Sequence, residues 1–497
     1  MNRSLIAAYY DKQTLLCQVY ILRGDTRGKY FGTDGFRGEA NVTPDAFHAY
    51  RIGRFLGWYY ASPLWERANS GQRPRVVIGK DTRRSGYMFE YAIAAGLTAS
   101  GADAYMLHVT TTPGVSFVTR QESFDCGIMI SASHNPYTDN GIKLMGAHGE
   151  KMDDATVEMV EAYLDHGAAG LIPFAANRPE IRLPEGDLPY ATGADIGRII
   201  DHVAGRNRYV GYLISLAANS YKHYRVGLDC ANGASWSIAP AVFEALGAKT
   251  YVMGAEPNGV NINREVGSTH TERLRRLVRE KSLDVGFAFD GDADRCIAVD
   301  ENGNEINGDH ILYVLGKSLS DQGNLAGNTV VTTIMSNMGL YQALDAAGIH
   351  YVKTTVGDRF VYERMVEEDF SLGGEQSGHV ILKKYATTGD GILTAIMLME
   401  EMAKTKLPLS KLASPVVMYP QVCLNVAVKN QDGVLHHPAV REKHAEISRR
   451  LGENGRILLR KSGTEPVLRI MVEASGQDLC HAYAMEMKQV MEQVSEA

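Results

Sequence analysis

The chain has 497 residues, of which 45% are hydrophobic and 22% charged, and its formal net charge is −7. This length exceeds what one hydrophobic core supports and predicts three or four domains of ordinary globular composition, which excludes a disordered chain. The acidic balance excludes a broad basic surface for nucleic acid, and the sequence has no apolar run long enough to predict a membrane span. We therefore expect neither nucleic acid nor a membrane as a partner.

The six cysteines show no paired spacing, which argues against a disulfide framework or a CxxC site. We therefore expect a reducing compartment and a cytoplasmic location. The start of the chain is moderately apolar but is interrupted by Asp11, Lys12 and Arg23, so it is typical of neither a signal peptide nor a spanning helix. We interpret residues 1–28 as a loosely ordered extension, or as the result of a start site placed too far upstream.

One pattern occurs three times along the chain: a β-branched strand, a loop of small or polar residues, and an apolar helix that ends near Ala-Gly. The copies begin at residues 76, 226 and 330, and their helices end near residues 100, 246 and 347. This repetition predicts an α/β protein with three similar domains, each with a mainly parallel mixed sheet between helices.

The last stretch has a different pattern, in which strand-like segments alternate with the helical patterns 440–451 and 479–494. It predicts a C-terminal α+β domain. After the extension, the expected domain bounds are 29–182, 183–306, 307–412 and 413–497.

A serine-containing loop follows the apolar strand pattern 127–130, with the sequence Ser131-Ala132-Ser133-His134-Asn135-Pro136. Ligands of open α/β sheets bind where strands end, so a serine at this point would be placed for nucleophilic chemistry. A turn capped by serine and asparagine is the competing interpretation of the hexapeptide.

Three carboxylates alternate directly after the apolar strand 285–289, at Asp290, Asp292 and Asp294. Their oxygens can converge on one hard divalent cation such as Mg²⁺. An EF-hand is excluded because Arg295 occupies the sixth position, where glycine is required, and because a strand precedes the loop. A solvated acidic turn is the remaining alternative.

Two further loops offer groups for a sugar phosphate. The segment 373–379 combines glycines with Glu375, Ser377 and His379, which suits hydrogen bonds to hydroxyl groups. The segment 460–466 combines two cations, two hydroxyls and a glycine turn, which predicts a phosphate clamp, with a hairpin loop as the alternative. The loops 32–38 and 79–83 each place a cation beside glycine, either to orient a phosphate or as surface turns.

In this order the motifs resemble the α-D-phosphohexomutase superfamily, and most closely its bacterial phosphoglucosamine mutase branch. The resemblance covers the chain from Lys29 onward, and segments 29–38, 258–263 and 373–379 are similar to that branch in particular. It implies an intramolecular phosphotransferase, classed as an isomerase, that interconverts glucosamine 6-phosphate and glucosamine 1-phosphate. A phosphomannomutase or phosphoglucomutase of the same superfamily is the alternative, and a serine phosphatase is a rival from another class.

The resemblance also implies roles for single residues. Ser133 would be a phosphoserine that holds one Mg²⁺ together with Asp290, Asp292 and Asp294. Lys143 and His379 would be candidate proton-transfer groups, with Arg37 and Arg295 beside the reacting phosphate. Groups for the sugar and its distal phosphate would come from Gly357, Asp358, Glu375, Ser377, Arg460, Ser462, Gly463 and Thr464.

Glucosamine 1,6-bisphosphate, or a related hexose bisphosphate, would serve as intermediate or activator. A sugar phosphate would be the small-molecule partner. A homodimer is compatible with the sequence. One departure from the family pattern lies in the metal loop, where Ala293 replaces the usual glycine. Alanine at this position still allows a tight loop if its φ is negative.

Overall fold

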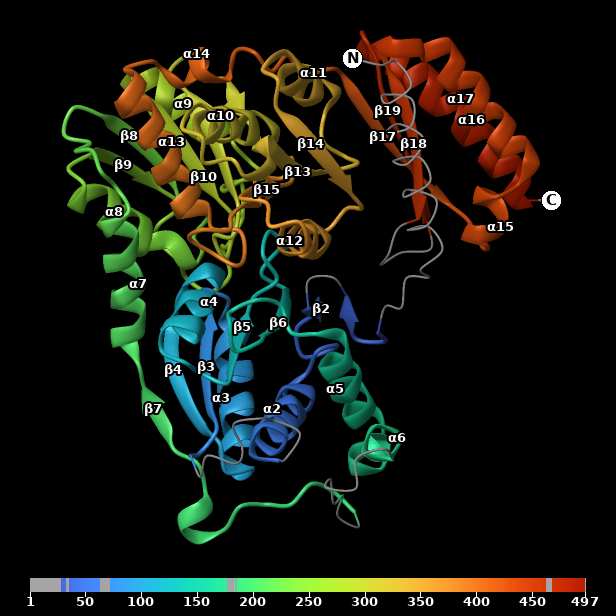
Figure 1. Ribbon diagram of the computed structural model, residues 1–497. Helices are drawn as coiled ribbons and strands as arrows, with labels where there is room; N and C mark the ends of the chain where they lie inside the picture. Colours follow the sequence, from blue (N-terminus) through green and yellow to red (C-terminus); the bar gives the residue numbers. More distant parts are fainter. Residues whose placement is uncertain are drawn as a thin grey trace.

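The computed structural model describes residues 28–32, 35–62, 72–176, 183, 186–461 and 467–496. The chain builds four domains, with the first (blue to cyan) below the second and third in Figure 1 and the C-terminal domain (red) to one side. Apart from Gly28, the expected extension lies outside the described residues. Across the described parts of the chain, no helix is long and apolar enough to cross a membrane.

The first domain is built on a seven-stranded mixed sheet in the order β1-β2-β6-β5-β3-β4-β7. β3 pairs in parallel with β4 and β5, whereas β6 is antiparallel to β5 and β2. Its strands are β1 (Phe31–Gly32), β2 (Gly35–Glu39), β3 (Arg75–Lys80), β4 (Asp103–Val109), β5 (Cys126–Ile130), β6 (Asp139–Met145) and β7 (Ile199–Asp201). Its helices are α2 (Ala46–Ala61), α3 (Arg84–Ala99), α4 (Thr112–Gln121), α5 (Asp154–His166) and α6 (Ile172–Ala175).

The second domain has a five-stranded sheet in the order β12-β11-β10-β8-β9, parallel at β8, β9 and β10. Its strands are β8 (Arg225–Asp229), β9 (Lys249–Met253), β10 (Val285–Phe289), β11 (Cys296–Asp300) and β12 (Glu305–Ile306). Its helices are α7 (Val203–Ser215), α8 (Ile238–Ala245) and α9 (Glu272–Lys281).

The third domain repeats this arrangement with the strand order β14-β13-β15-β16, in which β13 is parallel to β14 and β15. Its strands are β13 (Thr329–Thr333), β14 (His350–Thr354), β15 (Leu372–Gly374) and β16 (Val380–Leu382). Its helices are α10 (Gly308–Asp321), α11 (Met338–Ala346), α12 (Asp358–Glu367), α13 (Gly391–Thr405) and α14 (Leu409–Ala413).

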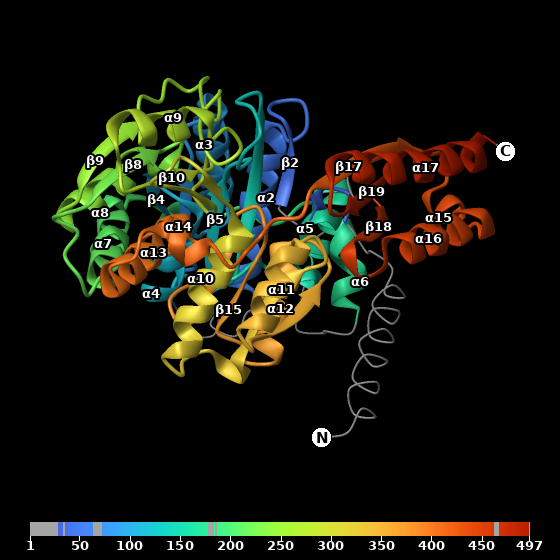
Figure 2. The ribbon, with the colours of Figure 1, turned by 90° about the horizontal axis from the view of Figure 1, so that it is seen from above.

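The C-terminal domain has an antiparallel sheet, β17-β19-β18, with α16 and α17 packed side by side in both views (Figures 1 and 2). Its elements are β17 (Gln421–Ala427), α15 (Gln431–Leu435), α16 (Pro438–Leu451), β18 (Arg456–Lys461), β19 (Val467–Glu473) and α17 (Gln477–Glu496). Three α/β domains and an α+β domain confirm the predicted fold class.

The second and third domains share one hydrophobic core, whereas the C-terminal domain has its own. One continuous cluster joins the second and third domains, from Phe287 of β10 to Leu372 of β15, and α13 contributes Ile396 between them. The C-terminal domain has a separate cluster that includes Ile470 and Met487. Its apolar packing is therefore separate from that of the other three domains.

The expected domain bounds stay predictions, and one strand bears on them. β7 lies beyond residue 182, yet it pairs in parallel with β4 at the edge of the first sheet. We therefore propose that the chain leaves the first domain after Asp201, because backbone hydrogen bonds to that sheet hold the chain until this point.

Candidate active site

The Ser133 loop and the acidic loop of Asp290, Asp292 and Asp294 meet between the first and second domains. Ser133 lies just beyond the C-terminal end of β5, and Asp290 directly follows β10. Both strands pair in parallel with a neighbour, so the two loops leave corresponding edges of their sheets. Gly291 permits the close approach of the two loops, since a Cβ there would lie 2.5 Å from the carbonyl oxygen of Ser133.

Ser133 is buried, and its hydroxyl points at the acidic loop. Its Oγ lies 2.5 Å from Asp290 Oδ2 and 3.3 Å from His134 Nδ1. Ser133 has a φ of +51°, a left-handed conformation that costs a non-glycine residue about 1–2 kcal/mol. Strain of this kind persists where surrounding contacts determine the backbone, as they do here.

The two cations of the 79–83 loop bind carboxylates and carbonyl oxygens of the protein itself. Lys80 Nζ lies 2.6 Å from Glu90 Oε2, and Arg83 pairs with Asp81, all fully buried. Arg83 Nη2 also donates to the carbonyl oxygens of Ser133 (3.1 Å) and Asn135 (2.6 Å). Both cations are therefore buried in ion pairs with carboxylates, which contradicts the surface turn that was one interpretation of this loop.

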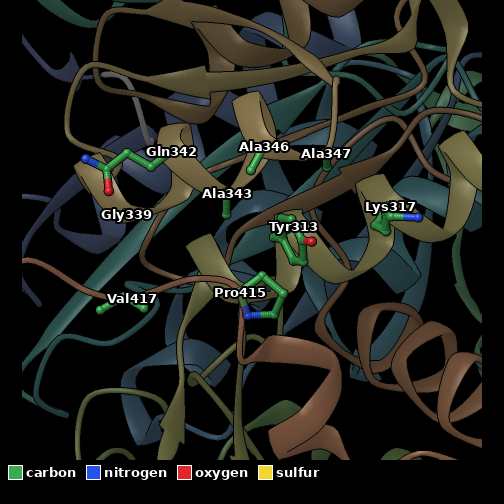
Figure 3. Close-up of a pocket in the computed structure, with 9 residues that line it drawn as sticks. All are labelled: Tyr313, Lys317, Gly339, Gln342, Ala343, Ala346, Ala347, Pro415 and Val417. Carbon is green, nitrogen blue, oxygen red and sulfur yellow. The ribbon is translucent and has the colours of Figure 1, made fainter.

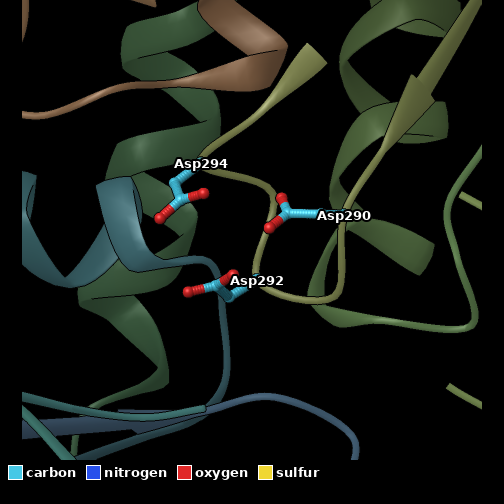
Figure 4. A group of neighbouring side chains, drawn as sticks. All are labelled: Asp290, Asp292 and Asp294. Carbon is cyan, nitrogen blue, oxygen red and sulfur yellow. The ribbon is translucent and has the colours of Figure 1, made fainter. Parts of the chain in front are cut away.

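Asp290, Asp292 and Asp294 converge as expected (Figure 4). All three are buried, and one oxygen of each lies within 4.8 Å of the others. Asp292 Oδ1 and Asp294 Oδ1 are buried without a hydrogen-bond partner among the described residues. Burial, together with the charges of Asp294 and Asp292, raises the pKa of Asp290 well above its usual range. Converging, under-satisfied carboxylate oxygens fit a divalent cation.

Ala293 has a φ of +56°, so the negative φ under which alanine would form this tight loop without strain is not adopted. The loop therefore does use the left-handed region that glycine adopts more easily, at a cost of about 1 kcal/mol for alanine. Hydrogen bonds from Ala293 N to the Asp290 carbonyl and from Gly391 N to the Ala293 carbonyl hold this conformation.

Lys143 lies on β6 and reaches the acidic loop. Its Nζ is 2.6 Å from Asp292 Oδ2 and 3.1 Å from Asp294 Oδ2. Burial alone would raise the pKa of Asp294, but Lys143 and then His379 and Arg295 hold it well below its usual range. Thr112, which sequence reasoning missed, also donates its hydroxyl to Asp292 Oδ2. Threonine at the first turn of a helix is so common that it gave no signal.

His379 lies between two acidic loops. Its Nδ1 is 3.7 Å from Asp294 Oδ1, its Nε2 is 3.6 Å from Asp358 Oδ2, and Nε2 accepts a hydrogen bond from Gly389 N at 3.0 Å. Burial would lower the pKa of His379, but Asp294, Asp358 and Glu375 raise it to about 9. The Gly389 hydrogen bond requires an unprotonated Nε2, so it opposes protonation at that nitrogen.

The two loops predicted for sugar recognition are joined to each other. Gly357 has a φ of +132° and donates its N–H to Glu375 Oε1 at 3.0 Å. Asp358, next in the chain, lies 2.6 Å from Lys151 Nζ of the first domain. Ser377 Oγ is shielded from solvent and has no hydrogen-bond partner among the described residues, so a ligand hydroxyl could bond to it.

The two arginines differ in how closely they approach the Ser133 loop. Arg295 Nη1 lies 3.2 Å from His134 Nδ1, and its backbone N–H donates to Asp290 Oδ1 at 3.2 Å. Arg37 is half-buried on β2, opposite Gly141 of β6. The structure thus brings Arg295 directly to the Ser133 loop and places Arg37 on the neighbouring strand pair.

Of the expected phosphate clamp, Arg460 lies at the end of β18, whereas Ser462, Gly463 and Thr464 lie outside the described residues. Arg460 is directly opposite Arg469 of β19. Like charges in this position repel each other, so an anion between them would be stabilising. The position of Arg469 opposite Arg460 follows only from the register of the two strands.

The cavity in Figure 3 is not this site. It has a volume of about 310 Å³ and lies against α10, α11 and the segment with Pro415 and Val417. Ser133, the three aspartates and the sugar-recognition loops do not line it. The chemistry-bearing residues therefore gather in a different place from the cavity.

Four family models match consecutive parts of the chain. They describe phosphoglucomutase/phosphomannomutase alpha/beta/alpha domains I, II and III and C-terminal domain, at residues 28–169, 207–303, 307–419 and 424–490. A phosphoglucosamine mutase from Lachnospira eligens is 57% identical over 456 residues, which cover 92% of this chain and 96% of that protein. The chain belongs to the phosphoglucosamine mutases. As a member of this family it is a phosphohexomutase, an enzyme of the isomerase class.

Solved structures support the fold of this phosphoglucosamine mutase family member. A phosphoglucomutase/phosphomannomutase family protein from Burkholderia thailandensis has a TM-score of 0.73 at 24% identity, covering 94% of this chain and 97% of its own. An N-acetylphosphoglucosamine mutase from Aspergillus fumigatus, in complex with GlcNAc-6P and magnesium, has a TM-score of 0.66 at 16% identity, covering 96% and 98%. A variant of the same fungal enzyme was solved with glucose 1,6-bisphosphate.

Proposed function

We propose that this enzyme interconverts glucosamine 6-phosphate and glucosamine 1-phosphate through a phosphorylated Ser133 and glucosamine 1,6-bisphosphate. The observation that carries the proposal is the 2.5 Å contact between Ser133 Oγ and Asp290, in a cluster of three carboxylates that fits a divalent cation. The identity of the phosphoglucosamine mutase relatives supports the amino sugar as substrate.

The proposed cycle has two transfers. In the first, the bond between Ser133 Oγ and phosphorus breaks while O1 of glucosamine 6-phosphate bonds to phosphorus, O1 loses its proton and Oγ gains one. The bisphosphate then turns over, and Ser133 Oγ takes the phosphoryl group from O6 with the opposite proton movements. Lys143 and His379 are our candidates for these proton transfers, because both lie beside the acidic loop.

Asp290, Asp292, Asp294 and the phosphate of Ser133 would hold one Mg²⁺. A cation bound there would neutralise negative charge on the transferring phosphoryl group. Arg295 and Arg37 would share that task. Transfers of this type depend chiefly on alignment and charge stabilisation, which rigid, buried groups supply.

The sugar and its distal phosphate would be held by the third and fourth domains. Glu375, Ser377 and the Gly357–Asp358 loop offer hydrogen bonds to hydroxyl groups, while Arg460, with Ser462, Gly463 and Thr464, would hold the phosphate that is not reacting. Since the C-terminal domain has its own core, it can close over the bisphosphate and exclude water. A cytoplasmic location is supported by the free thiols of Cys126, Cys230, Cys296, Cys423 and Cys480. A homodimer stays a prediction.

Ser133→Ala tests the proposal, with Thr138→Ala as control. Thr138 is an exposed residue of the same loop, and its hydroxyl lies 3.5 Å from Asp139 Oδ1. We expect Ser133→Ala to lose turnover and the phosphate seen by intact-mass spectrometry on the wild type, and Thr138→Ala to keep both. Active wild-type enzyme without phosphate on Ser133 would contradict the cycle.

Substrate choice is tested by comparing kcat/KM for glucosamine 6-phosphate with that for mannose and glucose 6-phosphates. We expect glucosamine 6-phosphate to be preferred. Preference for a neutral sugar would favour the phosphomannomutase or phosphoglucomutase alternative. Release of inorganic phosphate without an isomerised product would indicate a phosphatase.

A further inference from the structure

The Ser133 loop is held by a donor from a different domain. Asn263 lies in the second domain, and its Nδ2 donates to the carbonyl oxygens of Ser133 (2.8 Å) and Asn135 (2.9 Å). These are the same two oxygens that accept hydrogen bonds from Arg83 Nη2 of the first domain. One donor from each domain thus converges on both carbonyl groups.

These hydrogen bonds set the position of the Ser133 loop relative to the second domain as well as stabilising the loop. Carbonyl groups in a buried loop require donors, and Arg83, which belongs to the same domain as the loop, already supplies one to each. The second donor, Asn263, fixes where the loop lies relative to the second domain. That domain also carries Asp290, so the position of Asn263 bears on the contact between Ser133 Oγ and Asp290 Oδ2.

Asn263 also lies beside the acidic loop. A Cβ built on Gly291 would lie 3.1 Å from Asn263 Nδ2 and 2.5 Å from the Ser133 carbonyl oxygen. The amide therefore lies where the serine loop and the acidic loop approach most closely. Asn263 is buried and has a left-handed φ of +58°, and its N–H donates to the Ala231 carbonyl at 2.8 Å. Its own backbone is thus anchored within the second domain.

We propose that Asn263 is a positioning residue for phosphoryl transfer, which sets the first domain's Ser133 against the second domain's aspartates. The inference rests on the proposed phosphoserine cycle. It assigns Asn263 to the transfer step and not to sugar binding, because the residues proposed to bind the sugar lie in the third domain. Misplacing reacting groups by about 1 Å can slow a reaction about 100-fold.

Asn263→Asp is the sharpest test, since aspartate keeps the size and tolerates a positive φ but cannot donate to the two carbonyl groups. Asn261→Asp is the matched control: the same change in the same loop, where the Asn261 amide donates to the Glu256 carbonyl at 2.9 Å. Asn263→Ala is a second variant that removes the donor without adding charge.

We expect Asn263→Asp and Asn263→Ala to slow transfer of phosphate from isolated phosphoenzyme to glucosamine 6-phosphate at least about tenfold, with KM changed less than about twofold. The rate is measured in one turnover by rapid quench and intact mass, and melting temperatures are compared with those of Asn261→Asp. Unchanged transfer rates in both Asn263 variants, or equal slowing in Asn261→Asp, would overturn the inference. If the wild type itself carries no phosphate on Ser133, the proposed cycle fails instead.

Discussion

Lys151 Nζ of the first domain lies 2.6 Å from Asp358 Oδ1 of the third. Asp358 directly follows Gly357, whose N–H is bonded to Glu375, and its other oxygen lies 3.6 Å from His379 Nε2. This ion pair between the first and third domains therefore reaches the residues that we propose for sugar recognition.

Lys151→Met should weaken sugar binding more than catalysis, because it removes the contact that orients Asp358, while the neighbouring pair of Arg359 with Asp154 still joins this segment to the first domain. The pair is partly buried, so we expect KM for glucosamine 6-phosphate to rise about fivefold, equivalent to about 1 kcal/mol, with a smaller change in kcat. Lys317→Met, which removes the exposed pair with Asp321, is the control for steady-state kinetics. A fall in kcat with unchanged KM would contradict this role.

Magnesium should stabilise the folded protein, since a cation would neutralise three buried carboxylates that repel each other. A concentration about 100 times the dissociation constant would add about 2.7 kcal/mol, and chelation should abolish turnover until Mg²⁺ is restored. Thermal unfolding with and without MgCl₂ checks this, with KCl of equal ionic strength as control. Asp294→Asn should show a reduced response, and an equal response to both salts would exclude a specific site.

Arg456→Met should lower the free energy of unfolding by weakening the attachment of the C-terminal domain to the third domain. Arg456 Nε lies 2.7 Å from the buried Glu473, and its guanidinium also donates to the carbonyl groups of Ile334 and Ser336 in the third domain. Removing the cation leaves a buried carboxylate uncompensated, at a cost of about 3–5 kcal/mol.

Urea unfolding measures this cost. The double variant Arg456→Met with Glu473→Gln should recover part of it, because it removes the unpaired charge as well. A loss below about 1 kcal/mol in the single variant would show that the pair does not hold the domain.

Asp309 should make stability depend on pH. Its burial raises its pKa to about 7 in the folded protein, above the value of about 4 for an unfolded chain. A raised carboxyl pKa means that the folded state binds the proton more tightly than the unfolded chain does. The contribution of this proton to the free energy of unfolding is therefore complete below about pH 4 and is lost as the pH rises through about 7.

Asp309→Asn removes this titration. We expect its melting temperature, relative to wild type, to be higher at pH 8 than at pH 5, with Asp321→Asn, an exposed change on α10, as control. A difference between Asp309→Asn and wild type that does not change with pH would contradict the prediction.

The sequence by itself determined the fold class and the convergence of the three carboxylates. Strand and helix periods are local, so the three α/β repeats and the final α+β domain follow from hydrophobic patterns. Alternating carboxylates after a strand also meet locally, and Asp290, Asp292 and Asp294 converge as predicted.

Tertiary structure decided which groups complete the site. Three of these groups form hydrogen bonds with residues more than 120 positions away in the sequence, namely Asn263, Thr112 and Lys151. Only the packing of the domains brings each of them to its partner. The sequence could not show that Arg83 is buried against the Ser133 loop, nor that Ala293 is left-handed, because both depend on contacts from other segments. Local patterns specify what a loop can do, whereas the packing of domains specifies which partner it meets.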